Sequence, residues 1–469
     1  MNTVLPVAVV LAYVTLLTYV ALRARAAMHF EDFSLARRQL PLALIFGSLA
    51  ATYVGPGFSI SFVGRGFKTG ALFLIVGLAY ALQNILVGIF VAPKLRALKE
   101  CHTLGEAFGQ KYDRRCHIFA GMISVSICTF FAAVMAHAGA VLLNDMFGLP
   151  SWSGVMIVVG VTVLYTTFGG LRASVVTDAF QFAAFSVLLS LTLVLVLAFH
   201  LKTGAGGFTR ELVDVTREGI LSESPIKILG LLAAFLLGET LIPPYANRAL
   251  ASRTTETSRH AFVLAGCFSV VWFIVMIGLG IGARCVQVIP EGTEEDYVLL
   301  KLVEITLPTT GYALLSVVLV SVVMSSLDSL LNAGAVAFTA DVVKPFGSIS
   351  DDKALHVGRC ATIVIGGVAA AATPFVPSII EGLLICYTIW AAAILPALIF
   401  GLWLPRPQPL AALLSMSVGI FVAAIAVICL FAFPRAVETQ VIIIPALGAA
   451  LMAYGVGHIA ARSFAGGKR

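Results

Sequence analysis

The chain has 469 residues, of which 59% are hydrophobic and only 12% charged. A water-soluble protein of this size needs more charge to cover its surface, so the composition excludes a soluble protein and predicts an integral membrane protein. The formal net charge of +6 does not indicate nucleic-acid binding, because the basic residues lie beside apolar segments, where they meet anionic lipid headgroups.

Apolar stretches long enough to cross a hydrocarbon core of ~30 Å recur along the whole chain. Only helices or closed barrels satisfy the backbone within lipid, and these stretches lack the alternation of barrel strands, so they predict an all-α fold. In chain order the thirteen predicted spans are 3–23, 41–63, 70–93, 117–143, 152–169, 175–200, 226–247, 258–283, 309–343, 357–376, 378–404, 409–433 and 439–461.

Most of the 30 Lys and Arg residues lie at span ends that face the cytoplasm if the N-terminus is outside. This positive-inside bias predicts a multi-pass protein of the plasma (inner) membrane, with its N-terminus outside and its C-terminus in the cytoplasm. On this topology Arg248 belongs to a cytoplasmic segment. The acidic run from Glu291 to Asp296 lies outside, on a short surface helix.

The second and seventh predicted spans are interrupted near their middle. The second contains Gly55-Pro56-Gly57 and the seventh contains Pro243-Pro244. Proline removes a backbone donor and clashes with the preceding turn, and glycine adds conformational freedom, so both helices should break there. The freed backbone groups are tolerated within a membrane only where they line a cavity or bind something.

The two breaks fall at corresponding places if spans two to six form one five-helix repeat and spans seven to eleven form another. The predicted organisation is then one membrane transporter domain, 1–469, with repeats at 41–200 and 226–404. One extra helix lies at 1–40 and two more lie at 405–469. Paired interruptions indicate a transporter's binding site near the membrane midplane. Simple kinks stabilised by neighbouring helices are the alternative.

Glu239 lies one turn before the double proline of the seventh span. Three roles are open for it: to face a cationic solute, to relay a proton, or to bond the freed backbone amides. Aromatic residues near the breaks could form a pocket that holds a quaternary ammonium group by cation–π contact, or could simply pack together. They are Tyr53, Phe58, Tyr245, Tyr387 and Trp390.

Span nine carries a polar stripe whose members recur at i, i+4, i+7, i+8 and i+11, namely Ser321, Ser325, Asp328, Ser329 and Asn332. Its oxygens suit a hard cation such as Na⁺. Asp328 costs at least ~2.5–3.5 kcal/mol in mid-span, and residues 309–343 contain no Lys, Arg or His to pair with it. Together with Asp178 of span six, it makes two intramembrane carboxylates with little fixed cationic partnership. This favours a mobile cation, Na⁺ or H⁺, over a protonated structural aspartate.

Several motifs resemble those of the sodium:solute symporter family, which includes sodium/glucose, sodium/proline, sialic acid, pantothenate and choline transporters. The most specific is the Gly-Gly…Thr-Asp…Gln pattern that runs from Gly169 to Gln181. The others follow in the family's order over residues 30–405: Asp32-Phe33 to Arg37-Arg38, His102 to Glu106 with Tyr112, Asn247 to Ala251, Asp296, Met324 to Ser329, and Leu395-Pro396 to Trp403.

The resemblance implies a five-plus-five inverted-repeat core that works by alternating access with Na⁺ as the co-transported ion. The principal sodium site would use the carbonyls of Ala51, Val54 and Val322 with the hydroxyls of Ser325 and Ser326. A second sodium site, present in some members, would use Ser325, Asp328, Ser329 and Asp178.

The resemblance also places the solute near the breaks. The polar residues that bind sugar in glucose-type members are absent, because Tyr53 and Gly57 stand where those members carry an amide and an acid. The expected solute-binding residues are Tyr53, Gly57, Phe58, Glu239, Tyr245, Tyr387 and Trp390.

The predicted function is therefore Na⁺-coupled symport of a small organic solute into the cell, by a protein that works as a monomer in the bilayer. A proton-coupled symporter of the same fold is one alternative. A transporter-like sensor or channel is another, although the short tail after Ala461 leaves little room for a signalling domain. An intramembrane enzyme is not expected, because the sequence shows no typical nucleophile–base pair or metal-ligand set.

Overall fold

The computed structural model describes residues 4–23, 29–202, 208–285, 289–290, 292–434 and 436–466. The α-helices are α1 (Val4–Arg23), α2 (Phe30–Leu35), α3 (Leu42–Tyr53), α4 (Phe62–Thr69), α5 (Leu72–Leu86), α6 (Ala92–Arg96), α7 (Leu104–Lys111), α8 (Arg114–Phe147), α9 (Ser151–Lys202), α10 (Phe208–Ser222), α11 (Pro225–Leu237), α12 (Pro243–Ala251), α13 (Thr255–Cys285), α14 (Glu295–Thr306), α15 (Thr309–Ala337), α16 (Asp351–Ala372), α17 (Ile379–Trp403), α18 (Pro409–Ala432) and α19 (Ile443–Gly466). Shorter helical turns are η1 (Ala36–Arg38), η2 (Gly57–Ser61), η3 (Val87–Val91), η4 (Phe338–Val343), η5 (Lys344–Phe346) and η6 (Thr373–Phe375).

The all-helical membrane fold is confirmed. Among the described residues, nine helices are long and apolar enough to cross a membrane, or up to eleven if two strongly bent pairs each count as one span. The count of thirteen stays a prediction. One source of the difference is α9, a single helix where two spans were expected, which is interrupted at Gly170 (φ +61°, ψ −169°).

Both predicted helix breaks are confirmed. The first broken helix consists of α3 followed by η2 and α4, and its two halves are bent by 62°. The second consists of α11 and α12, which are separated by the non-helical residues 238–242. Leu241 in this gap has a positive φ of 48°, which a helix does not allow.

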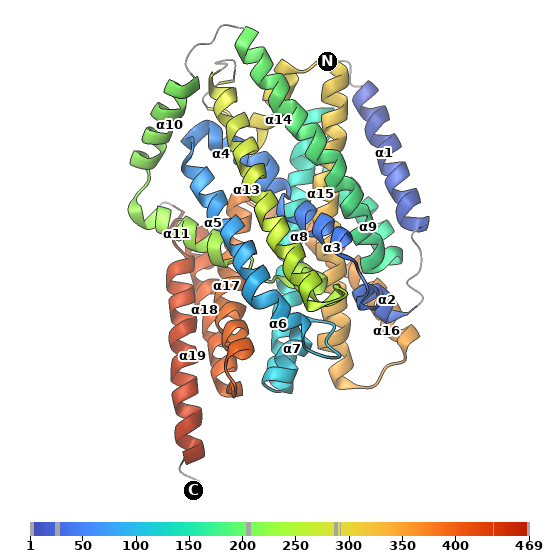
Figure 1. Cartoon of the computed structure of the whole chain (residues 1–469), viewed down its shortest axis with the longest axis vertical. Helices are drawn as coiled ribbons and strands as arrows, with labels where there is room; N and C mark the ends of the chain where they lie inside the picture. Colours follow the sequence, from blue (N-terminus) through green and yellow to red (C-terminus); the bar gives the residue numbers. More distant parts are fainter. Residues whose placement is uncertain are drawn as a thin grey trace.

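Burial separates a central helix from peripheral ones. In the span Thr309–Phe346, which contains α15, 89% of the apolar stretch that would cross the membrane is buried within the protein. The corresponding share is 22% in α18 and 28% in α19. Figure 1 shows α18 and α19, coloured orange to red, at one edge of the bundle and α1, in dark blue, at the opposite edge. The polar stripe of α15 faces inward, since its five members Ser321, Ser325, Asp328, Ser329 and Asn332 are at most 1% exposed.

Gly170 provides a test of this arrangement. Its backbone conformation is one that essentially only glycine adopts, and a Cβ there would meet the backbone of Phe33. We expect Gly170→Ala to lower the free energy of unfolding by about 1–3 kcal/mol. The measurement is the thermal midpoint of the purified protein, which should fall. Gly160→Ala on the same helix is the control, because its Cβ would enter open space. Equal midpoints for the two variants would contradict the kink.

Candidate cation and solute site

The first break frees backbone oxygen from the helical ladder. The amide of Gly55 donates to the Thr52 carbonyl at 3.2 Å instead of continuing the ladder to Ala51. The Val54 carbonyl accepts a hydrogen bond from the Ser59 hydroxyl, which leaves one lone pair of that carbonyl. The carbonyls of Ala51 and Val54 are therefore available at this break.

Ser326 of α15 faces the same break. A Cβ on Gly55 would lie 2.9 Å from Ser326 Oγ, so the hydroxyl reaches the Gly-Pro-Gly segment. Ser326 is 3% exposed, and its hydroxyl has no hydrogen-bond partner among the described residues. A buried hydroxyl without a partner is costly. The expected ligand Ser326 thus reaches the first break at Gly55 with a hydroxyl that has no partner among the described residues.

Ser325 is oriented by Asp178. Its hydroxyl donates to Asp178 Oδ1 at 2.5 Å, so the lone pairs of Ser325 Oγ remain available as acceptors or ligands. Val322, one turn earlier on α15, is fully buried. The side of α15 that carries these residues is therefore held in place by a carboxylate from α9.

Asp178 forms a buried ion pair with Arg248. Arg248 Nη2 lies 2.8 Å from Asp178 Oδ2, and both side chains have 0% exposure. Arg248 also donates to Ser48 Oγ at 2.7 Å, to the Pro244 carbonyl at 2.9 Å and to the Ser329 hydroxyl. The Ser48 hydroxyl in turn donates to Asp178. This network joins α3, α9, α12 and α15.

The ion pair corrects two expectations. The placement of Arg248 in a cytoplasmic segment is wrong, because α12 starts at the double proline inside the bundle and is buried along its whole length. The expectation that Asp178 lacks a fixed cationic partner is wrong for the same reason. Four residues after Pro244, the Arg248 side chain is still within reach of the Asp178 carboxylate.

Asp328 lies apart from this network. Its Oδ1 accepts a hydrogen bond from Thr166 at 2.7 Å, while its Oδ2 has no partner among the described residues. The Ser174 hydroxyl faces the same carboxylate and also has no hydrogen bond of standard geometry. The four residues expected for a second sodium site do not share one set of hydrogen bonds: Asp178 bonds Ser325 and Arg248, Arg248 bonds Ser329, and Asp328 bonds Thr166 of α9.

Glu239, at the second break, is bound by tyrosines. Its carboxylate accepts hydrogen bonds from the hydroxyls of Tyr80 and Tyr245, the latter at 2.8 Å. The Tyr387 hydroxyl faces the carboxylate as well, without a hydrogen bond of standard geometry. The described bonds of this carboxylate thus come from side chains and not from the freed backbone amides.

Gln83 of α5 binds the freed backbone amides instead. With its amide turned so that the oxygen faces the break, it accepts from Thr240 N at 2.7 Å and from Glu239 N at 3.2 Å, and donates to the Phe235 carbonyl at 3.2 Å. Trp390 Nε1 donates to the Thr240 carbonyl at 2.9 Å. Trp390 therefore supports the backbone of the second break, although it was expected in the solute pocket.

A cavity of about 30 Å³ lies between the two breaks. Its volume is enough for a water molecule but not for an organic solute. Its lining includes four of the expected solute residues and the sodium ligand Ser326: Gly57, Phe58, Glu239, Tyr245 and Ser326. Tyr53 packs edge-on against Tyr245, with ring centroids 4.7 Å apart. Residues expected for the solute and residue Ser326, expected for the cation, therefore line one cavity.

The cavity is closed, since every residue that lines it is buried. Elsewhere in the bundle, Asp296 of α14 accepts hydrogen bonds from Ser61 of η2 and from the amide of Ile379, which begins α17. Glu295 beside it pairs with Arg65 of α4 at 2.6 Å. Burial raises the pKa of the Glu295 carboxyl, and the nearby Arg65 opposes this shift. The acidic residues Glu295 and Asp296 are thus fixed contacts; Glu291 lies outside the described residues.

Arg38 of η1 bonds two other segments of the chain. It donates to the carbonyls of Leu250 and Leu98, each at 3.1 Å. Leu40 pairs with Ser252 in an isolated parallel bridge. The segment between α2 and α3 therefore covers the end of α12.

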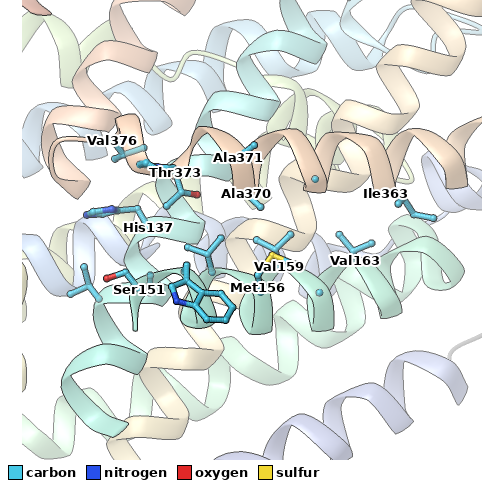
Figure 2. Close-up of a pocket in the computed structure, with 17 residues that line it drawn as sticks. His137, Ser151, Met156, Val159, Val163, Ile363, Ala370, Ala371, Thr373 and Val376 are labelled. Carbon is cyan, nitrogen blue, oxygen red and sulfur yellow. The ribbon is translucent and has the colours of Figure 1, made fainter. Parts of the chain in front are cut away.

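A larger groove lies elsewhere and faces outward. It has a volume of about 860 Å³ and lies between α8, α9 and α16. Figure 2 shows its mainly apolar lining, with His137 at one end beside Thr373 and Ser151. Trp152 and Met156 in this groove are 72% and 61% exposed, as expected for side chains that meet lipid. The groove includes no residue of either break and is not the candidate site.

Five residues of the site were not expected from the sequence: Ser48, Tyr80, Gln83, Thr166 and Ser174. Gln83 gave a usable signal, because an amide in the middle of an apolar span requires a partner. Tyr80, Ser48, Thr166 and Ser174 gave none, since tyrosine, serine and threonine are common in helix packing.

Two interrupted helices that meet at a closed cavity near unpartnered oxygens define a secondary transporter. The family model described as "SSF: Sodium:solute symporter family" matches residues 33–419, so the chain belongs to the sodium:solute symporter family.

Curated relatives agree with this assignment. The chain is 24% identical over 414 residues to Sodium/glucose cotransporter 2 of Rattus norvegicus, covering 76% of this chain but only 60% of that protein. It is 26% identical over 411 residues to the High-affinity proline transporter PutP of Bacillus subtilis, covering 83% of this chain and 85% of that protein.

A solved structure of a Na⁺-coupled sialic acid symporter in a substrate-bound outward-open state has the same fold. It superposes with a TM-score of 0.81 at 16% sequence identity, over 96% of this chain and 97% of that one.

The Asp178–Arg248 pair yields a prediction about stability. Removing one partner of a buried ion pair leaves an uncompensated charge, which costs about 3–5 kcal/mol. Arg248→Met should therefore lower the thermal midpoint strongly. The double variant Arg248→Met/Asp178→Leu should recover most of that loss, because neither charge remains. Additive losses in the double variant would contradict the pairing.

Proposed function

We propose that this protein moves a small organic solute into the cell by Na⁺-coupled symport with alternating access. One observation carries the proposal: the buried Ser326 hydroxyl has no partner among the described residues and lies against Gly55 of the first break, in the same cavity as Glu239. Oxygen ligands of this kind suit Na⁺. The membership of the family and its Na⁺-coupled relatives support it.

The primary sodium site would use the carbonyls of Ala51, Val54 and Val322 with the hydroxyls of Ser325 and Ser326. The closed cavity supports alternating access, because a solute can enter or leave only when one end opens. Opening outward would release α14 from η2 and α17. Opening inward would move the segment around Arg38 away from α12.

A second cation site would centre on Asp328. Asp178, Ser329 and Ser325 remain its expected neighbours, and Asp328 Oδ2 and the Ser174 hydroxyl, which lack partners among the described residues, support a site that also includes Ser174. A proton on Asp328 is the alternative occupant, which would make the protein a proton-coupled symporter. We further propose that the N-terminus lies outside and that the monomer is the working unit.

The primary site can be tested without knowing the solute. We expect Ser326→Ala to raise the Na⁺ dissociation constant by about ten-fold or more, because an oxygen ligand of a charged group is lost. The measurement is binding of radioactive Na⁺ to the purified protein. Ser316→Ala on the same helix is the control, since that hydroxyl bonds only the Tyr312 carbonyl of its own helix. Equal affinity in both variants would refute the site.

The second site predicts a change in cation dependence. Asp328→Asn keeps the shape of the side chain and should lower the number of Na⁺ ions bound per protein while Ser326-dependent binding persists. Asp352→Asn, at the exposed start of α16, is the control. If Na⁺ binding is unchanged but its pH dependence disappears, the occupant of the site is a proton. If neither changes, Asp328 is structural.

A further inference from the structure

Glu239 is a buried carboxylate without a cationic partner. It is 6% exposed and lines the cavity between the breaks. Its described contacts are tyrosine hydroxyls, and no Lys, Arg or His is among the groups that act on it. Neutral donors satisfy hydrogen bonds but do not neutralise charge. A carboxylate in a low-dielectric site therefore favours an occupant that supplies a positive charge.

The surroundings of Glu239 are aromatic. Phe58 and Tyr245 line the cavity, and Tyr80 lies between them, with its ring centroid 4.3 Å from that of Phe58 and its hydroxyl 3.2 Å from that of Tyr245. The ring of Tyr387 packs against that of Phe235, with centroids 5.4 Å apart. Aromatic faces attract ammonium and guanidinium groups, most strongly when these are desolvated. Carboxylate and rings together form a surface for an organic cation.

The cavity offers little to other solute classes. None of the residues that the structure places around it is basic, so an anionic group would meet Glu239 without compensation. The nearby Arg248 is already committed to Asp178, Ser48 and Pro244. A neutral polyol needs several donors and acceptors, whereas the lining contributes mostly apolar side chains with Thr52 and Ser326.

We propose that the transported solute carries a positively charged amine, which binds between the Glu239 carboxylate and the aromatic walls of the cavity. This inference rests on the proposed function and names the chemical class of its solute. Ser326 lines the same cavity, so a sodium ion and the organic cation would lie close together. Like charges repel strongly at short range in a medium of low dielectric constant. The Glu239 charge offsets that repulsion and lets both bind.

The test uses pairs of cations and neutral isosteres. Thermal midpoints of the purified full-length protein are measured in NaCl and in KCl with tetramethylammonium, choline, methylguanidine and a short alkyl diamine. For choline the isostere is 3,3-dimethylbutan-1-ol, which replaces the charged nitrogen by carbon. We expect at least one cation, and no isostere, to raise the midpoint in NaCl. If no cation does, or if isosteres act equally well, the inference is overturned.

Variants assign the effect to Glu239. Glu239→Gln should weaken binding of the active cation by about ten- to a hundred-fold, the range for hydrogen bonds to charged groups. Glu239→Asp keeps the charge and should retain the preference for the cation over its isostere. Glu256→Gln, a 67% exposed carboxylate on α13, is the matched control. Unchanged cation binding in Glu239→Gln would overturn the inference.

The response to Na⁺ separates this inference from the proposed function. If NaCl stabilises both the wild type and Glu239→Gln relative to KCl, the sodium site stands whatever the solute is. If NaCl stabilises neither protein, Na⁺ coupling fails. A cation effect that is independent of Na⁺ would still support the role of Glu239.

Discussion

A polar backbone group inside the hydrocarbon region must find a partner within the protein. The two helix breaks create several such groups around one cavity, and the structure satisfies them in different ways. At the second break, Gln83 and Trp390 bind the amides and a carbonyl of residues 239–240. At the first, Ser59 is the only side chain among the described residues that bonds a freed carbonyl. The oxygen that remains unpartnered, together with Ser326, is what a cation could bind.

The buried pair of Arg248 and Asp178 holds the two breaks in a fixed relation. Arg248 bonds the hydroxyl of Ser48, which lies on the first broken helix, and the carbonyl of Pro244, which lies on the second. Asp178 orients Ser325 on α15. Desolvating two charges is expensive, and the additional hydrogen bonds to both of them compensate for part of that cost. The ion pair therefore contributes more to the geometry of the site than to stability.

Several features of this site could be predicted from local sequence chemistry. Gly55-Pro56-Gly57 and Pro243-Pro244 predicted where the helices break, and the spacing of Ser321, Ser325 and Asp328 predicted one buried face. These succeed because proline geometry and helical periodicity are local. The burial of Arg248 was missed because counting positive charges assigns a residue to the nearest span end, whereas α12 continues past residue 247 to Ala251 and is buried along its length. The partnership of Gln83 with residues 239–240 was missed for a similar reason, since it joins helices far apart in sequence.

The central claim is that freed carbonyls of the first break and the Ser326 hydroxyl surround a sodium ion. The most direct measurement is an experimental structure at high resolution, determined in NaCl and again with K⁺ as the only alkali cation. Density between Ser326 Oγ and the carbonyls of Ala51 and Val54, present in NaCl and absent in K⁺, is the expected result. A continuous helix through residues 54–56, or Ser326 hydrogen-bonded to its own helix in both salts, would contradict it.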